Sequence, residues 1–194
     1  MRKIILASSS PQRRELLQKL GIDFEVRPSD FDEASLASAD PHHLTRSLAL
    51  AKATSVARMI PDGGALVIGA DTVVNFNGEI FGKPKDARHA REMLKKLNGN
   101  THSVVTGFAI YDTSTHKFVT DSVETRLQFK SLSNDEIDAY VGSGEPFGQA
   151  GGYAIQGLAS FFVEKVNGDY NNVLGLPTEA LTNKLCEFGV LVGE

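Results

Sequence analysis

The segment KIILASSSPQRRELL, residues 3–17, predicts how the first part of this chain folds. Residues 3–7 contain a short apolar run that predicts a buried strand. Residues 11–20 carry leucines on one face of a predicted helix. Between them, Ser10 is a suitable N-cap and Pro11 suits the first helical position. We therefore expect a strand, a turn and a helix.

Two arginines follow directly, and their charge has the wrong sign for this place. The N-terminus of a helix already carries about half a positive charge, so Arg13 and Arg14 in the first turn are unfavourable there. An anionic ligand would make both guanidinium groups, the free N–H groups and the hydroxyls of residues 8–10 favourable together. The alternative is that both arginines face solvent or pair with acids such as Glu15.

The rest of the chain alternates between strand-like and helix-like patterns. Strands are expected at residues 22–27, 65–76, 79–81, 102–112 and 117–129. Helices are expected at residues 41–59, 86–97, 134–141 and 178–188, the first ended by Pro61-Asp62-Gly63-Gly64. The segment at residues 142–157 is the richest in glycine. This order favours one α/β domain, residues 1–194, with a central sheet and a cleft.

Composition excludes several classes of protein. The chain has 20 basic and 24 acidic residues and a net charge of −4, so no global field attracts nucleic acid. Its one cysteine, Cys186, excludes an internal disulfide framework. The apolar run near the start is too short for a signal peptide, and no run approaches the ~20 apolar residues of a membrane span. We expect a cytoplasmic protein that binds neither nucleic acid nor membrane.

Acidic residues at two places could carry chemistry. Asp71 interrupts the apolar run VIGADTVV, where an unpaired carboxylate would be costly, so it needs a partner. A divalent metal, a lysine, a role as general base or a hydrogen bond at the strand end would each explain it. Asp30, Asp32 and Glu33 form an acidic loop that could add oxygen ligands for magnesium, or could simply be solvated.

Two lysines are candidates for binding phosphate. Lys52 lies in the apolar helical stretch LALAKA, and Lys83 lies in the tight turn GKP. Isolated lysines are more often surface residues, so each is a weak signal alone. Neither GxxxxGK[ST] nor GxGxxG occurs, which means that a common nucleotide-binding loop does not hold the phosphate.

The motifs LASSSPQRRELL, GADTVV, GKP, TGFAI, GEPFGQAGGYAIQG and VLGLP occur in this order along nearly the whole chain. Taken together they resemble the Maf family of nucleoside triphosphate pyrophosphatases. The resemblance implies a fold like that of inosine triphosphate pyrophosphatase (Maf/Ham1): a long mixed sheet flanked by helices, with two lobes around a cleft. It also implies a homodimer.

The same resemblance implies hydrolysis of a nucleoside triphosphate to the monophosphate and pyrophosphate. It implies a divalent cation, Mg²⁺ foremost, with Mn²⁺ or Co²⁺ as alternatives, and a house-cleaning role against noncanonical nucleotides. Asp71 would act as general base or metal ligand, and Glu33 as a second metal ligand. The residues that would bind the triphosphate are Ser8, Arg13, Lys52 and Lys83.

The strand motif GADT and the late motif AGxYxIQG resemble the branch of the family that acts on dTTP and UTP. This resemblance implies that Thr72 and Gln156 select the base, because a Gln156 amide could pair with a pyrimidine edge as donor and acceptor. The alternative branch, which acts on 7-methylguanosine triphosphate, has Ser-Asp-Gln in the strand motif and an acidic residue at position 156.

One position departs from the pyrimidine branch, which usually reads S-P-R-R. Here Gln12 replaces the first arginine, so either Arg14 compensates as a substrate-binding residue or phosphate affinity and base choice are altered. Neighbours on a helix diverge by about 100°, and their spacing alone does not say which of them faces the cleft. Two other functions remain alternatives: a phosphatase that releases single phosphates, and a noncatalytic nucleotide-binding module.

Overall fold

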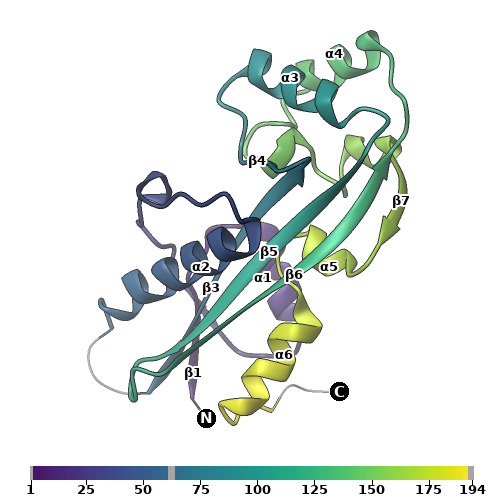
Figure 1. The fold of residues 1–194 in the computed structure, drawn as a ribbon. Helices are drawn as coiled ribbons and strands as arrows, with labels where there is room; N and C mark the ends of the chain where they lie inside the picture. The colour runs from purple at the N-terminus through teal and green to yellow at the C-terminus, as the bar shows by residue number, and fades with distance from the viewer. Residues whose placement is uncertain (1, 61–63, 192–194) are drawn as a thin grey trace.

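The computed structural model describes residues 2–60 and 64–191 (Figure 1). The strands are β1 (Lys3–Leu6), β2 (Glu25–Val26), β3 (Ala65–Phe76), β4 (Glu79–Phe81), β5 (Thr101–Asp112), β6 (Phe118–Phe129) and β7 (Val163–Asn167). The α-helices are α1 (Pro11–Lys19), α2 (Pro41–Ala57), α3 (Ala87–Leu97), α4 (Asn134–Gly142), α5 (Tyr170–Val173) and α6 (Thr178–Glu187). Short 3₁₀ turns occur at η1 (Glu33–Ser35), η2 (Ala150–Gly152) and η3 (Leu158–Phe162).

These strands form one mixed sheet with the order β2-β1-β3-β5-β6-β7, and β4 also pairs with β3. β1 runs parallel to β2 and β3, and the other pairs are antiparallel. β1 pairs with β3 from Ala65 to Ile68, and β4 pairs with β3 from Val74 to Phe76. Within the described chain, residues 69–73 of β3 therefore have a strand partner on one side only. This opening at the sheet edge is where the site lies.

Helices cover both faces of the sheet at the end where β1 and the N-terminus of the chain lie (Figure 1). Alternate residues of a strand point to opposite faces. Ile4 and Leu6 accordingly pack with leucines of α1 and α6, whereas Ile5 packs with α2. The expected α/β class, with helices flanking a mixed sheet, is confirmed.

Two strand glycines let α2 lie unusually close to the sheet. A Cβ on Gly69 would lie 2.1 Å from the Ala49 carbonyl oxygen, and one on Gly107 would lie 2.4 Å from the Thr45 carbonyl carbon. Any side chain at either position would push α2 away, because atoms do not approach this closely without bonding. The close contact matters for the site, since α2 carries Lys52.

The C-terminal ends of β3 and β6 and the N-terminal end of β5 extend into a separate apolar core, where α3 and α4 lie together (Figure 1). Its centre includes Leu94, Phe129 and Ile137, each almost fully buried. α4 begins with the expected capping box, in which the Ser133 hydroxyl accepts from the Glu136 N–H and the Glu136 carboxylate accepts from the Ser133 N–H.

Most differences from the expected elements are at their ends. The second strand covers only Glu25–Val26, and α2 ends at Ala57 instead of residue 59. The expected stop at Pro61-Asp62-Gly63 lies outside the described residues. The four-residue α5 was not expected, because so short a helix has no periodic pattern and only its cap, Asp169, marks it.

Among the described helices, none combines the length and the apolar character needed to cross a bilayer.

Candidate active site

A pocket of about 720 Å³ lies at the opening in the sheet edge. This volume is in the range typical of sites for small molecules. Its lining comes from the β1–α1 turn, η1, α2, β3, the segment after β4 and the glycine-rich residues 148–156. Eight of the nine residues expected in the site line it: Ser8, Arg13, Glu33, Lys52, Asp71, Thr72, Lys83 and Gln156.

The alternation of β3 explains why Asp71 and Thr72 have different partners. Asp71 shares its face of the strand with Val67, which packs against α2, and Thr72 shares its face with Ile68, which packs in the core of α1 and α6. Asp71 therefore contacts Lys52 of α2, and Thr72 contacts Arg13 of α1. One strand delivers a carboxylate and a hydroxyl to two sides of the same pocket.

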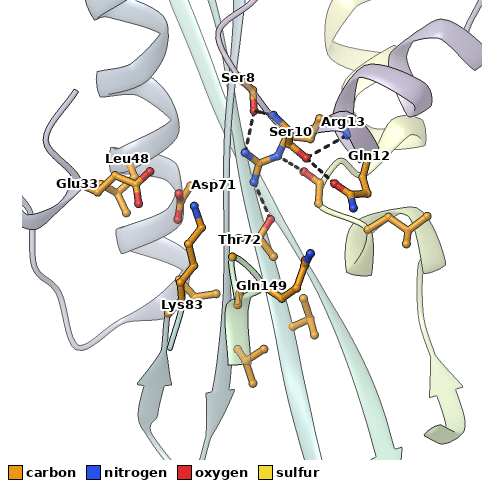
Figure 2. Close-up of a pocket in the computed structure, with 18 of the residues that line it drawn as sticks. Ser8, Ser10, Gln12, Arg13, Glu33, Leu48, Asp71, Thr72, Lys83 and Gln149 are labelled. Atoms are coloured by element: carbon orange, nitrogen blue, oxygen red, sulfur yellow. Dashed lines mark hydrogen bonds between the residues drawn. The ribbon is translucent and has the colours of Figure 1, made fainter. Parts of the chain in front are cut away.

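Arg13 is held by three hydrogen bonds that fix its guanidinium group at the pocket (Figure 2). Its Nε donates to the Gly175 carbonyl oxygen at 2.8 Å, its Nη1 to Ser8 Oγ at 3.2 Å and its Nη2 to Thr72 Oγ1 at 3.0 Å. Ser10 caps α1, as expected, by accepting from the Arg13 N–H at 3.4 Å. The unfavourable cation in the first turn is thus turned towards the pocket.

The structure does not place Arg14 in the pocket, contrary to its expected role as a substrate-binding residue. Its side chain is exposed and lines a separate hollow with Gln18 and Asp23, away from the pocket. The reason is helical geometry, since residues three and four apart share a face. Arg13 precedes the buried Leu16 and Leu17 by three and four residues, so it shares their inward face. The spacing of Arg13 from these leucines is therefore the sequence signal that distinguishes it from Arg14.

Gln12 faces the pocket at the position where an arginine is usual in the pyrimidine branch. Its Oε1 accepts a hydrogen bond from Ser10 Oγ at 3.1 Å. Because Arg14 points elsewhere, no charge replaces the missing one at this turn, and the pocket has one cation fewer than S-P-R-R would provide.

Lys52 joins two carboxylates into what we call the carboxylate–lysine cluster, comprising Glu33, Lys52 and Asp71. Its Nζ lies 2.6 Å from Asp71 Oδ1 and 2.8 Å from Glu33 Oε1. Lys52 and Asp71 are both buried, with 8% and 7% of their surface exposed. A buried carboxylate is tolerated when it is paired and hydrogen-bonded, so the lysine accounts for an aspartate within an apolar strand.

The charges in the pocket act on one another. Burial alone would raise the pKa of Glu33, but the hydrogen bond from Lys52 and the positive charges of Lys52, Lys83 and Arg13 outweigh it, so this pKa lies below its ordinary value. Burial lowers the pKa of Arg13, and the nearby Asp71 and Glu33 oppose the shift. An arginine remains charged in proteins even so. At neutral pH the pocket therefore holds charged groups of both signs.

The acidic loop contributes one of its three carboxylates to the pocket, that of Glu33. Asp30 accepts a hydrogen bond from Ser55 Oγ at 3.0 Å, and Asp32 caps η1 by accepting from the Ala34 N–H at 3.1 Å. Neither lines the pocket. The structure therefore does not place Asp30 and Asp32 beside Glu33 in the pocket, contrary to the expectation for the acidic loop.

The opposite side of the pocket is built by the glycine-rich segment, residues 142–157. Gln156 lines it, and so do Gln149 and Tyr153, which sequence reasoning did not single out. The density of glycine signalled that the backbone comes close to something here, but not which side chains it presents. Lys83 reaches into the same space, extending towards Asp71 (Figure 2).

The donor set suits a hard cation that keeps ligands from elsewhere. Asp71 and Glu33 are hydrogen-bonded to the same ammonium group, so a positive charge already sits between their carboxylates. Magnesium is usually held by one or two carboxylates together with substrate phosphates and water. No cluster of three or more His, Cys, Asp or Glu residues that could hold a metal occurs in residues 2–60 and 64–191. The two carboxylates therefore fit the magnesium pattern and not an all-protein cage.

Comparisons with known proteins show the family to which the chain belongs. The Ham1 protein of Staphylococcus aureus, a solved structure, has a TM-score of 0.48 and 15% identity over 66% of this chain and 72% of that chain. A dTTP/UTP pyrophosphatase of Geotalea uraniireducens (strain Rf4) is 50% identical over 97% of this chain and 96% of its own length. One of Clostridium novyi (strain NT) is 47% identical over 97% and 98%. The family described as Maf-like protein matches residues 3–188, and the chain belongs to this Maf family.

Proposed function

We propose that this protein hydrolyses nucleoside triphosphates between the α and β phosphates, releasing the monophosphate and pyrophosphate. We propose dTTP, UTP and modified pyrimidine nucleotides as its substrates, in keeping with the names of its relatives. The observation that carries the proposal is that Arg13 and the carboxylate–lysine cluster line one pocket. This reaction needs positive charges that bind the phosphates and a carboxylate that activates water.

The triphosphate lies against the cationic side of the pocket in this proposal. A guanidinium group has five N–H donors, and the three hydrogen bonds of Arg13 within the described chain leave two for phosphate oxygens. Ser8, just before α1, adds a hydroxyl beside it. Lys83 approaches from the other side and neutralises further charge.

Asp71 is the general base in this mechanism. It accepts a proton from a water molecule whose oxygen attacks the α phosphorus, while the bond from that phosphorus to the bridging oxygen breaks and pyrophosphate departs. Lys52 holds the Asp71 carboxylate through the 2.6 Å contact and restrains its orientation. The developing negative charge falls where Arg13 and Lys83 can stabilise it.

We propose Mg²⁺ as the cofactor, with Asp71 and Glu33 as the protein ligands. The lowered pKa of Glu33 keeps its carboxylate ionised at neutral pH, as a ligand must be. When bound, such a cation would neutralise phosphate charge. Lys52 would then share the two carboxylates with it.

Gln156 is proposed to recognise the base, since its amide can donate and accept along a pyrimidine edge. It lines the pocket from the glycine-rich segment, and it stands where the 7-methylguanosine branch carries an acid. The homodimer and the house-cleaning role rest on the family resemblance alone, the cytoplasmic location rests on composition, and all three are part of this proposal. Light scattering after size-exclusion chromatography tests the first of them.

A panel of nucleoside triphosphates, assayed with and without Mg²⁺, tests the function. We expect pyrophosphate and monophosphate in equal amounts, fastest with UTP and dTTP. Inorganic phosphate without pyrophosphate would indicate a phosphatase, and binding without turnover would indicate a nucleotide-binding module. Either result would overturn the proposal.

A further inference from the structure

A line of hydrogen bonds leads from Arg13 away from the pocket into the protein interior. Arg13 Nη2 donates to Thr72 Oγ1 at 3.0 Å, and Thr72 Oγ1 lies 2.9 Å from Thr106 Oγ1. Thr106 Oγ1 in turn donates to the Asn172 carbonyl oxygen at 2.8 Å. Thr106 and Asn172 are fully buried, and neither lines the pocket.

The direction of each hydrogen bond follows from counting protons. A threonine hydroxyl has one proton, and a carbonyl oxygen can only accept. Thr106 gives its proton to Asn172, so the Thr72 hydroxyl must donate to Thr106. Thr72 then accepts from Arg13 and has no proton left for a substrate. It cannot donate to a carbonyl group of a pyrimidine base while this arrangement holds.

The far end of this line is firmly anchored. The Asn172 side-chain amide donates to the Val104 carbonyl oxygen and to Thr125 Oγ1, both at 3.0 Å, which fixes α5 against β5 and β6. Two residues after α5, the Gly175 carbonyl oxygen accepts from Arg13 Nε. The segment from Asn172 to Gly175 thus holds the guanidinium group both directly and through the two threonines.

Gly175 also shows how closely this segment fits around the arginine. A Cβ there would lie 3.3 Å from both Arg13 Nε and Thr72 Oγ1. The hydrogen bonds of Arg13 and the close approach of the Gly175 backbone therefore both favour one orientation of the Arg13 side chain.

We propose that Thr106 and Asn172 are positioning residues for Arg13, acting through Thr72, and that Thr72 serves the arginine instead of selecting the base. The inference rests on the proposed role of Arg13 in binding the triphosphate. A guanidinium group that is held in place loses less conformational freedom when phosphate binds, so the buried hydroxyls contribute to affinity without touching substrate. Because every nucleotide has the same triphosphate, their effect is the same for all bases.

The variant Thr106→Val tests this, since it keeps the shape of the side chain and removes the hydroxyl. We expect KM for UTP and for dTTP to rise by the same factor, at most about tenfold, the upper end of the range for a hydrogen bond between neutral groups. The ranking of substrates stays unchanged, and Thr106→Ser restores KM. Thr72→Val, at the pocket wall, is expected to behave like Thr106→Val and provides the test if the buried variant does not fold.

A double-mutant cycle separates positioning from a general structural effect. Thr106→Val should have no further effect on kcat/KM in an Arg13→Gln background, because the group that it positions is gone. Full additivity of the two losses would overturn the inference, and so would a change in the ranking of UTP and dTTP in Thr72→Val. If Arg13→Gln alone keeps wild-type kcat/KM, the proposed role of Arg13 fails instead, so the two failures are distinguishable.

Discussion

The two sides of the pocket are held in place by different means. On the charged side, Arg13 and Asp71 project from a regular helix and strand and are fixed by side-chain hydrogen bonds to Thr72 and Lys52. On the glycine-rich side, residues 142–157, the fixing contacts are mostly to the backbone.

Glu145 provides the main tie within the glycine-rich segment. Its carboxylate accepts the N–H groups of Leu158 at 2.9 Å and Ala159 at 3.2 Å, just beyond Gln156. The Gly151 N–H donates to the Gly82 carbonyl oxygen at 2.9 Å, next to Lys83. In the proposed function, the charged side determines the rate for every nucleotide and the glycine-rich side determines which base is preferred.

The largest effect is expected from Asp71→Asn on the charged side. The amide cannot accept the proton of the attacking water, so kcat should fall at least about 10²-fold for UTP and dTTP alike. Pyrophosphate release measures the rate, and circular dichroism checks the fold. The matched control is Asp30→Asn, which changes a carboxylate outside the pocket and should leave kcat within about twofold. Near-normal turnover by Asp71→Asn would refute its catalytic role.

Next in size is the contrast between two adjacent arginines. Arg13→Gln should lower kcat/KM about 10²-fold, since it removes charge-assisted hydrogen bonds to phosphate, whereas Arg14→Gln should stay within about twofold. The pair has the same change in composition and net charge, so a difference between the two variants reports position alone. Equal losses in both would contradict the assignment of Arg14 to the outer surface.

The sequence predicted more of the charged side of the pocket than of the glycine-rich side. The long strands and the caps at Ser10 and Ser133 are local patterns, and each predicted what the structure has. The family motifs supplied the remaining charged residues. The orientation of Arg14 and the places of Asp30 and Asp32 were not predicted correctly, although the helical spacing of the leucines indicates the first.

The hydrogen bonds that the sequence did not predict join residues far apart in the chain. Thr106 and Asn172 are 66 residues apart, and Arg13 and Gly175 are 162 apart. No local pattern specifies such contacts, because they depend on how strands and turns are arranged in space. The glycine-rich segment was recognised as a close approach, but its fixing by Glu145 required the fold.

On the glycine-rich side, Gln156→Glu should lower turnover of UTP and dTTP by about tenfold while leaving the melting temperature nearly unchanged. An acid cannot donate a hydrogen bond at neutral pH, so one half of the pairing with a pyrimidine edge is lost. Rates for a full set of nucleoside triphosphates give the ranking, with Gln18→Glu, outside the pocket, as control. An unchanged ranking would remove Gln156 from base selection.

The smallest effect concerns Glu33 and pH. Its pKa in the folded protein lies below the ordinary value of 4.5, so its pairing with Lys52 stabilises the fold above about pH 4.5 and is lost as the pH falls through the folded value. Its side chain is half exposed, so Glu33→Gln should lower the melting temperature at pH 7 by at most about 3 °C. Thermal unfolding should show this difference vanishing at acidic pH; a difference that grows there would contradict the sign.

Hydrolysis of UTP in ¹⁸O-labelled water tests the central claim most directly, since it reports which phosphorus the water attacks. If Asp71 activates water against the α phosphorus while Arg13 holds the triphosphate, mass spectrometry will find the label in the monophosphate and none in the pyrophosphate. Label in the pyrophosphate, or release of labelled inorganic phosphate, would contradict the account.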